Sequence, residues 1–353
     1  MTAALPLVSV VMPAYRCAGQ LRESMAGLLA SPLPREQWEF IVADDGSLDD
    51  TGATAALVAD RVVRVDDGPR GPAHARNMGA RVARGAILLF VDADVVVHPD
   101  VLPMVVAHFQ RDPTLGAVFG SYDDQPSASG LVSQYRNLLH RRVHLAHAGA
   151  SQTFWAGCGA VRRDAFMAVS GFDAARFPRP QIEDIDLGYR LHDAGERILL
   201  DPTLLGTHLK RWTLRGMLRT DLRDRAIPWM HLLLERRTAL HAGPLNTNRR
   251  EQLLTVLMAL CLVLFSAAMI SHSGALLTLG LAALALVLLG NAALFRWFAQ
   301  VRGVPFALAT VPLRLLFYMV SAAGASWAIV TQPWQPSRHP RTSLTLDGSV
   351  ASP

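Results

Sequence analysis

Short apolar runs alternate with segments of helical composition over the first part of the chain. The runs are rich in Val, Ile and Leu and have the length of buried strands; they cover residues 7–12, 39–43, 61–65 and 86–91. The segments between them, residues 21–29, 51–59 and 73–83, have helical composition. This alternation predicts an α/β domain in which helices cover both faces of a parallel sheet.

The pattern continues beyond this half with fewer apolar runs. Residues 118–122 and 197–200 are expected to be strands, and residues 131–145 and 182–194 are expected to be helices. A glycine-rich stretch at residues 156–160 is expected to precede a further helix.

Three long apolar stretches follow, at residues 253–270, 274–295 and 304–330. The first two are long enough to cross a hydrocarbon core, and only Ser271-His272-Ser273 joins them, so they are expected to form a tight hairpin. Arginines flank both outer ends, which places these ends in the cytoplasm; they are Arg249, Arg250, Arg296 and Arg302.

The third apolar stretch contains prolines at 305 and 312 and one charge, Arg314. We expect residues 304–312 to lie at the interface and residues 313–330 to cross, with Arg314 snorkelling towards lipid phosphate. This topology puts Arg338 and Arg341 outside, against the positive-inside tendency, so a re-entrant third segment remains an alternative.

These patterns divide the chain into four parts. Residues 1–235 form the expected catalytic domain, with a basic interfacial helix near 211–225, and residues 236–250 form a juxtamembrane linker. Residues 251–332 form a membrane domain of about three apolar helices, at 253–270, 274–295 and 313–330. Residues 333–353 form a flexible tail.

The formal net charge of +5 is modest, and much of it lies between Lys210 and Arg250. This favours a local anionic partner and argues against nucleic acid, which would need basic side chains over a whole face. The three cysteines are far apart and predict neither a disulfide framework nor a zinc site. The N-terminus has no signal-peptide pattern, so the polar domain is expected to stay in the cytoplasm.

Arginine recurs every four residues at 211, 215, 219 and 223, with leucines and a methionine beside it. On a helix, this spacing gives a slowly drifting basic stripe next to an apolar one, which is typical of a helix at the headgroup boundary. Asp221 and Asp224 are expected to weaken the field of the stripe, and an ordinary solvated helix is the alternative.

Polar groups follow each predicted strand of the first half, where ligands of open α/β sheets bind. They are Pro13-Ala14-Tyr15, Asp44-Asp45-Gly46-Ser47, Asp66-Asp67-Gly68 and Asp92-Ala93-Asp94. Asp92 and Asp94 leave a buried strand on the same side, an arrangement of hard oxygen ligands that suits a divalent cation on a diphosphate. The alternative for each acidic group is a helix or turn cap.

The sequence resembles the inverting, GT-A-fold glycosyltransferases of family 2, which are often membrane-anchored in bacteria. The resemblance rests on motifs that run in the family's order from about Val8 to Arg225. Besides the groups after strands one, two and four, they are Gly71-Pro72-Ala73-His74-Ala75-Arg76-Asn77-Met78-Gly79, Gly171-Phe172-Asp173 and Glu183-Asp184-Ile185-Asp186-Leu187.

The resemblance implies a donor site and a cation site. Pro13, Tyr15 and Asp45 would lie along the nucleotide base, Asp44 near the base or ribose, and Arg76 would help to hold the nucleotide. Asp92 and Asp94 would bridge Mg²⁺ or Mn²⁺ to the diphosphate, and His208 resembles the histidine that completes the metal site in some members.

The resemblance also implies a catalytic base and an acceptor pocket. Asp184 would take the acceptor proton with Glu183 in support; the alternative is that Glu183, Asp184 and Asp186 are simply a favourable acidic first helical turn. Trp155, Gly157 and Gly159 would line the acceptor pocket, and the alternative is a tight turn with a packed tryptophan.

The expected protein is therefore a multi-pass enzyme of the inner membrane with its catalytic domain in the cytoplasm. It would move a sugar from a nucleotide-sugar donor to a glycolipid, a lipid-linked glycan or a polysaccharide precursor, in contact with membrane phospholipids. A polyprenyl-phosphate sugar synthase is one alternative, and a non-catalytic membrane scaffold with a degenerate transferase domain is another. Nucleotidyl transfer is disfavoured because the first strand is not followed by a glycine-rich phosphate loop.

Overall fold

The structure is a computed structural model that describes residues 6–237 and 245–332. The described residues form two compact units, which we call the sheet unit (6–125 and 148–209) and the helical unit (126–147 and 210–332). The sequence analysis ended the expected catalytic domain at residue 235. The structure instead groups two earlier segments, 126–147 and 210–235, with the C-terminal helices. The expected tail and residues 238–244 of the expected linker lie outside the described residues.

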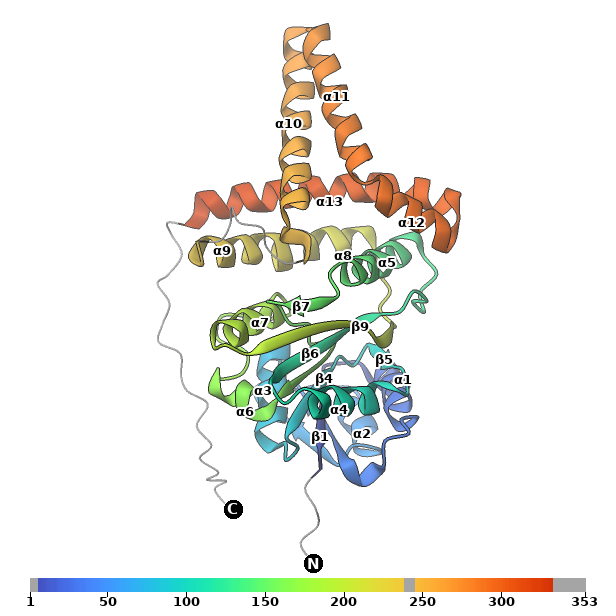
Figure 1. Ribbon diagram of the computed structural model, residues 1–353, viewed down its shortest axis with the longest axis vertical. Helices are drawn as coiled ribbons and strands as arrows, with labels where there is room; N and C mark the ends of the chain where they lie inside the picture. Colours follow the sequence, from blue (N-terminus) through green and yellow to red (C-terminus); the bar gives the residue numbers. More distant parts are fainter. Residues whose placement is uncertain (1–5, 238–244, 333–353) are drawn as a thin grey trace, which may run out of the picture. The chain divides into compact units, whose positions relative to one another are not determined.

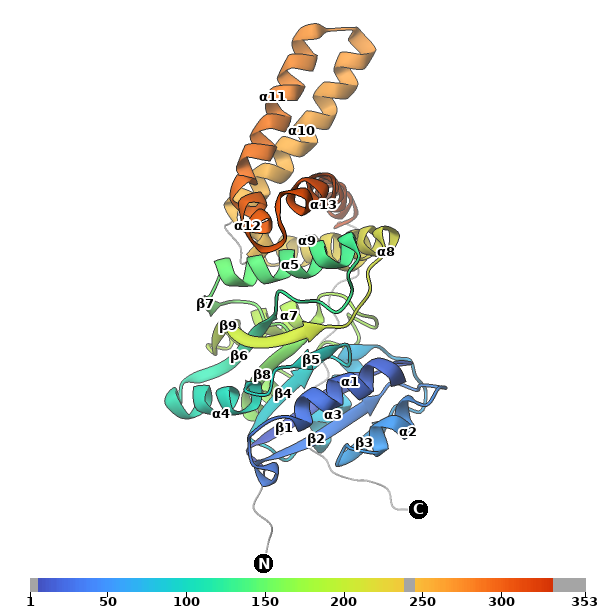
Figure 2. The same cartoon turned by 90° about the vertical axis from the view of Figure 1, so that its right-hand side faces the viewer.

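The first half of the sheet unit matches the prediction closely. Strands β1 (Val8–Ala14), β2 (Trp38–Asp44), β3 (Arg61–Arg64) and β4 (Ile87–Val91) are parallel neighbours in the order β3-β2-β1-β4 (Figure 2). The helices between them are α1 (Ala18–Leu29), α2 (Thr51–Ala56) and α3 (Pro72–Val82), and a 3-10 turn, η1 (Arg35–Gln37), precedes β2.

Helices cover both faces of this half, as the alternation of side chains requires. Leu21 and Met25 of α1 belong to the same core cluster as Val10 of β1. On α3, a Cβ at Gly79 would come within 2.5 Å of Val11, whose side chain points to the opposite face. Glycine at 79 therefore lets α3 lie directly on the sheet.

The second half of the sheet is mixed, which the prediction of a parallel sheet did not include. β8 (Cys158–Arg162) runs antiparallel between β4 and β6 (Leu115–Tyr122), and β9 (Arg197–His208) runs parallel to β6. β5 (Val95–Val97) and β7 (Gly149–Ser151) both pair antiparallel with β9. Three helices complete the unit: α4 (Val101–Arg111), α6 (Arg163–Ala168) and α7 (Glu183–Asp193).

The glycine-rich stretch before α6 is itself largely strand, because it supplies the start of β8. A Cβ at Gly159 would lie 2.3 Å from the Trp155 carbonyl oxygen and 2.6 Å from the Phe154 ring. Glycine is needed there for the chain to fold back so closely on itself.

The helical unit begins with α5 (Leu131–Ala146) and resumes with α8 (Leu214–Arg219), the π-helical segment η2 (Thr220–Ala226) and α9 (Ile227–Glu235). A 3-10 turn, η3 (Leu245–Thr247), precedes α10 (Arg249–Ser271), α11 (Gly274–Gly290), α12 (Ala292–Arg302) and α13 (Val304–Thr331). Side chains from α5, α8, α12 and α13 form one apolar cluster in this unit.

Helices α10 and α11 form the expected hairpin (Figure 1). His272 adopts a left-handed conformation at the end of α10, and the Ser273 hydroxyl accepts from the Leu276 N–H at the start of α11. Large apolar side chains such as Leu253, Val263 and Ile270 are exposed along the hairpin. Among the described residues, α10 and α13 are long and apolar enough to cross a membrane, and α11 with α12 forms a third candidate that bends by 51°.

Helix α13 is one continuous helix through Pro312, although the sequence analysis divided it there. It lies across the base of the hairpin instead of alongside it (Figures 1 and 2). The prediction that Arg314 snorkels to lipid phosphate is wrong. Arg314 is buried, and it donates to Glu251 at 2.6 Å and to the Asn291 side-chain oxygen at 2.7 Å.

Candidate active site

Two adjacent carboxylates at the end of β2 are buried and hydrogen-bonded to backbone. Asp44 accepts from the Ser47 N–H at 2.9 Å, so it closes the turn after the strand. The two Asp45 oxygens accept from the N–H groups of Arg70, at 2.8 Å, and Gly71, at 2.7 Å. Asp45 therefore fixes the loop that leads into α3, the helix that carries Arg76.

Arg76 occupies the centre of a buried ion-pair group. Its guanidinium donates to Asp92 at 2.6 Å and to Glu183 at 2.9 Å, and it lies 5.3 Å from the Phe172 ring centroid. Burial alone would lower the pKa of Arg76, but the carboxylates of Asp92 and Glu183 raise it above its ordinary value. Arg76 thus joins the end of β4 to the start of α7.

Asp184 follows Glu183 at the start of α7 and has an altered acidity. Burial, together with the neighbouring Glu183 carboxylate, raises the pKa of Asp184 to about 7. Its Oδ2 accepts weakly from the Ala156 N–H at 3.3 Å. A carboxylate with this pKa is half protonated near neutral pH, which is the property required of a general base.

Asp92 is the next carboxylate of the group. Burial is the main cause that raises its pKa above the ordinary value, and Asp94 adds to the effect while Arg76 opposes it. The Asp92 N–H donates to the Gly157 carbonyl at 3.2 Å, so the loop before β8 is tied to the end of β4.

Asp94 and His208 lie close together just beyond this strand end. The His208 Nε2 lies 3.6 Å from the Asp94 Oδ2, and its ring stacks on Tyr122 with centroids 4.2 Å apart and planes 13° apart. Tyr122 in turn packs edge-on against Trp155, at 4.8 Å between centroids.

These positions bear on the predicted metal ligands. Within residues 6–237 and 245–332, no group of three or more His, Cys, Asp or Glu side chains is arranged to hold a metal ion. The three ligands expected from the sequence, Asp92, Asp94 and His208, are thus not assembled as a set, and Asp92 Oδ1 is already bonded to Arg76. Asp94 and His208 do fit as a pair, because an ion about 2.0–2.2 Å from each atom fits a separation of 3.6 Å.

The remaining predicted residues lie near the same strand ends. Pro13 is in β1, and Tyr15 follows it with 39% of its surface exposed. A Cβ at Gly157 would lie 2.3 Å from the Trp155 ring, so glycine is required for the tryptophan to pack over the turn. This packing matches the tight-turn alternative for Trp155, Gly157 and Gly159, and an acceptor-binding role stays a prediction.

Sequence reasoning missed Tyr122 and the Ala156 N–H. Tyr122 ends β6, and the sequence already predicted a strand that stops at this residue. The rule that ligand-binding groups follow strand ends would have included it. No local signal marks the contact between Ala156 and Asp184, which are 28 residues apart.

Comparison with known proteins identifies the domain. The sequence model described as glycosyl transferase family 2 matches residues 9–170. The chain carries a family 2 glycosyltransferase domain. The mannosyltransferase PcManGT from Pyrobaculum calidifontis has a TM-score of 0.54 over 92% of this chain and 88% of its own, at 21% identity. That likeness shows the GT-A fold.

Curated relatives are glycosyltransferases as well. Validoxylamine A glucosyltransferase of Streptomyces hygroscopicus subsp. jinggangensis is 31% identical over 231 residues, 55% of this chain and 53% of the relative. Poly-beta-1,6-N-acetyl-D-glucosamine synthase of Staphylococcus aureus (strain MSSA476) is 27% identical over 61% of this chain and 53% of its own length. The chain spans about half the length of these relatives.

Proposed function

We propose that this protein transfers a sugar, with inversion, from a nucleotide-sugar donor to an acceptor hydroxyl presented at a membrane. The observation that carries the proposal is the position of Asp184, a carboxylate at the start of α7 beside Glu183, next to the Arg76–Asp92 pair and 3.3 Å from the Ala156 N–H. Its raised pKa of about 7 agrees with a proton-accepting role. The family 2 domain supports the reaction class, because its members transfer sugars from activated donors. A degenerate scaffold would not need this arrangement of carboxylates.

In the proposed reaction, the Asp184 carboxylate removes the proton from the acceptor hydroxyl. The hydroxyl oxygen forms a bond to the anomeric carbon while the bond from that carbon to the diphosphate oxygen breaks, and the nucleoside diphosphate leaves with the electron pair. Glu183 keeps Arg76 in place and, as a neighbouring anion, helps to hold the Asp184 pKa near neutrality.

We propose that Asp94 and His208 hold a divalent cation, Mg²⁺ or Mn²⁺, together with oxygens of the donor diphosphate. PcManGT was solved with GDP-Man and Mn²⁺, which is consistent with such a site. When bound, the cation stabilises the negative charge of the departing diphosphate. Asp92 supports this cation site indirectly. It is bonded to Arg76 and to the Gly157 carbonyl, and these contacts fix the end of β4, which precedes Asp94.

The acidity of Asp184 favours a hydroxyl acceptor over a phosphate acceptor. A lipid phosphate has a second pKa near 6, so it is already an anionic nucleophile at neutral pH and needs no proton acceptor. A hydroxyl does need one. Asp184 therefore gives no support to a polyprenyl-phosphate sugar synthase. It supports transfer to a sugar hydroxyl of a glycolipid or lipid-linked glycan.

We further propose that the α10–α11 hairpin crosses the membrane and that α13 lies near its surface. Two helices that cross at a steep angle do not both run along the bilayer normal, and α13 crosses the base of α10 (Figure 1). The arginines at both ends of the hairpin favour the cytoplasm for these ends, by the positive-inside rule. The catalytic domain is then cytoplasmic, where nucleotide sugars are available.

The test is the Asp184→Asn variant of the full-length protein. Turnover, measured as release of nucleoside diphosphate in the presence of acceptor lipids extracted from membranes, should fall by about 10²–10⁴-fold. Donor binding, measured by calorimetry with UDP-, GDP- and TDP-sugars and Mn²⁺, should be unchanged. The matched control is Asp193→Asn, which makes the same change at an exposed position at the other end of α7 and should keep full turnover. If the Asp184→Asn variant turns over as fast as the unaltered protein, Asp184 is not the base. If the variant no longer binds the donor, Asp184 is a structural or metal-binding residue.

A further inference from the structure

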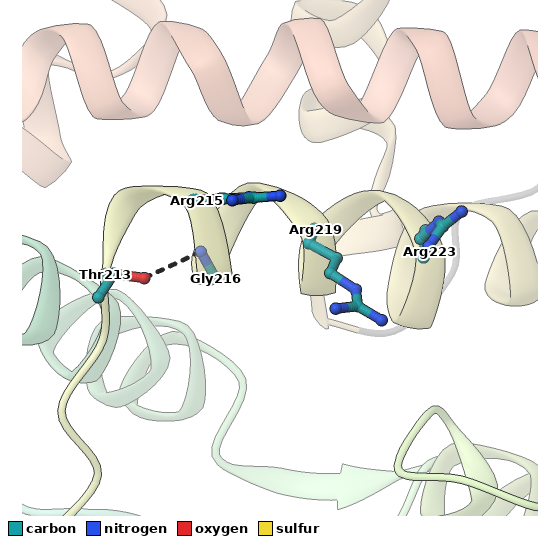
Figure 3. A pocket seen from close by; sticks show the side chains of 5 residues that line it. All are labelled: Thr213, Arg215, Gly216, Arg219 and Arg223. Carbon is teal, nitrogen blue, oxygen red and sulfur yellow. Dashed lines mark hydrogen bonds between the residues drawn. The ribbon is translucent and has the colours of Figure 1, made fainter.

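Three arginines of the helical unit surround an open hollow on α8 and η2. The hollow has a volume of about 420 Å³ and is lined by Thr213, Arg215, Gly216, Arg219 and Arg223 (Figure 3). We call it the arginine hollow. Its lining contains three positive charges and no acidic side chain.

The guanidinium groups of the hollow are available to a ligand. Within the described residues, Arg215, Arg219 and Arg223 have no hydrogen bond or ion pair with another side chain, and all three are exposed. Asp221, which the sequence analysis expected to weaken the basic field, is buried and ion-paired with Arg136 of α5. The acid therefore holds the segment to the rest of the unit and does not neutralise the hollow.

The π-helical turn explains why the three arginines share one side. In an α-helix, a spacing of four residues exceeds one turn, so a stripe at i, i+4 and i+8 drifts around the axis. The segment η2 (Thr220–Ala226) has wider turns, with i to i+5 hydrogen bonds, and it starts between Arg219 and Arg223. The wider turn limits the drift. π-Helical turns are also frequent at functional sites.

The segment that carries the hollow packs against α13, a helix with exposed apolar side chains. Helix α13 packs on η2 so closely that a Cβ at Gly324 would come within 2.6 Å of the Ala226 Cβ. Elsewhere on α13, exposed side chains include Leu308, Trp327 and Ile329. An arginine group and an exposed apolar surface on two helices in contact suit the boundary between headgroups and acyl chains.

From this arrangement we propose that the arginine hollow binds the phosphate of a membrane lipid. Guanidinium groups form paired hydrogen bonds with phosphate oxygens, and several of them together match the charge of a phosphomonoester or diphosphate better than that of a carboxylate. The adjacent apolar surface of α13 accommodates the attached chain. The proposal concerns the helical unit alone, so it can fail or hold independently of the proposed catalytic role of Asp184.

The experiment uses the full-length protein in a neutral detergent and four probes at matched concentrations. They are farnesyl phosphate, dioctanoyl phosphatidylglycerol, dioctanoylglycerol, which has acyl chains but no phosphate, and inorganic phosphate. Calorimetry should show saturable binding of the two phosphate-bearing lipids and much weaker binding of the other two. Tighter binding of farnesyl phosphate would assign the hollow to an isoprenoid carrier, whereas equal binding would assign it to phospholipid headgroups; both results support a lipid-phosphate site.

Arginine variants distinguish lipid binding at the hollow from nonspecific attraction of lipids to the basic surface. Each single change, Arg215→Gln, Arg219→Gln or Arg223→Gln, should weaken lipid binding about fivefold, and the triple variant about 100-fold. Arg211→Gln is the matched control, since Arg211 is exposed in the same basic stretch but does not line the hollow, and it should bind as the unaltered protein does. All variants should keep the same melting temperature and donor affinity.

Two results would overturn the proposal. Inorganic phosphate binding as tightly as the lipids would show a site for a soluble anion. Lipid binding that survives in a correctly folded triple variant would place the lipid elsewhere. If the triple variant does not fold, the three single variants decide the question by the same criterion.

Discussion

The two units of this protein each bury one arginine against acidic side chains, with different results. Arg76 in the sheet unit is 4% exposed and Arg314 in the helical unit is 3% exposed. Arg76 contacts two carboxylates, Asp92 and Glu183. Arg314 contacts one carboxylate, Glu251, and the neutral groups of Asn291 and Tyr318.

The difference lies in the balance of charge. Around Arg76 there are more carboxylates than cations, since Asp184 and Asp94 stand next to the pairs that Arg76 forms. Burial is the main cause that raises the pKa of Asp92 and Asp184, and the neighbouring carboxylates add to it. Around Arg314 one buried cation meets one buried anion, and the half-exposed Arg250 lies 3.2 Å from the same Glu251 carboxylate. An excess of buried negative charge costs stability but provides a proton acceptor and attracts a cation, whereas a balanced pair only joins helices. We call Arg76, Asp92, Asp94, Glu183 and Asp184 the unbalanced cluster, and we infer that it is functional. The buried pair of Arg314 and Glu251 is inferred to be structural.

The largest effect that tests this comparison is expected in the helical unit. Replacing Arg314 by Met removes the buried cation beside Glu251 and leaves this carboxylate with the half-exposed Arg250 and the Tyr318 hydroxyl, which should cost about 3 kcal/mol. The melting temperature of the unit should then fall by roughly 6 °C or more. Cys261 is buried in α10, so its reaction with a thiol-reactive dye in a Cys17→Ser/Cys158→Ala background reports the unfolding of this unit.

The double variant Glu251→Gln/Arg314→Met is the matched control for this prediction. Removing both charges together should restore most of the lost melting temperature, because neither ion is left buried alone. Donor affinity should not change in either protein. A single variant as stable as the unaltered protein would show that the pair does not hold the helices, and would break the comparison.

The next effect concerns the unbalanced cluster and appears as a pH dependence of turnover. The proposed base, Asp184, would work only when ionised, and burial raises its pKa to about 7, above the ordinary carboxyl value. The kcat/KM should therefore be constant above pH 7 and should fall by about tenfold for each pH unit below it. The residual activity of Asp184→Asn should lack this step. A profile that is flat from pH 5 to pH 8 would show that Asp184 is not the base.

The sequence predicts those features whose residues lie close together along the chain, and it does not predict contacts between residues that are far apart in sequence. Strands β1 to β4 and helices α1 to α3 were predicted because each depends on its own run of apolar and polar residues. The acidic strand ends were found for the same reason. The direction of β8 was not, because antiparallel insertion between β4 and β6 is decided by partners that a local pattern does not contain.

The charge balance itself could not be read from the sequence. Arg76 and Glu183 are separated by 107 residues, and Arg314 and Glu251 by 63. The resemblance assigned Arg76 to the nucleotide, a role that stays a prediction, and the sequence wrongly assigned Arg314 to lipid phosphate. Neither assignment included the carboxylate partners, because a single arginine gives no sign of them. Asp221 is a similar case, because its partner Arg136 lies in α5, far away in sequence.

The smallest expected effect concerns a neutral residue at the edge of the unbalanced cluster. Tyr122 stacks on the buried His208 ring, and this contact holds the ring with its Nε2 towards Asp94. Tyr122→Leu removes the flat partner and should raise the Mn²⁺ concentration for half-maximal activity about tenfold, as for other residues that orient a metal ligand. Tyr122→Phe is the matched control, because it keeps the stacked ring and should shift the Mn²⁺ concentration for half-maximal activity by less than about twofold. If Tyr122→Leu needs no more Mn²⁺ than Tyr122→Phe does, the position of His208 is not set by Tyr122, and the cation site must rely on the donor diphosphate and Asp94 alone.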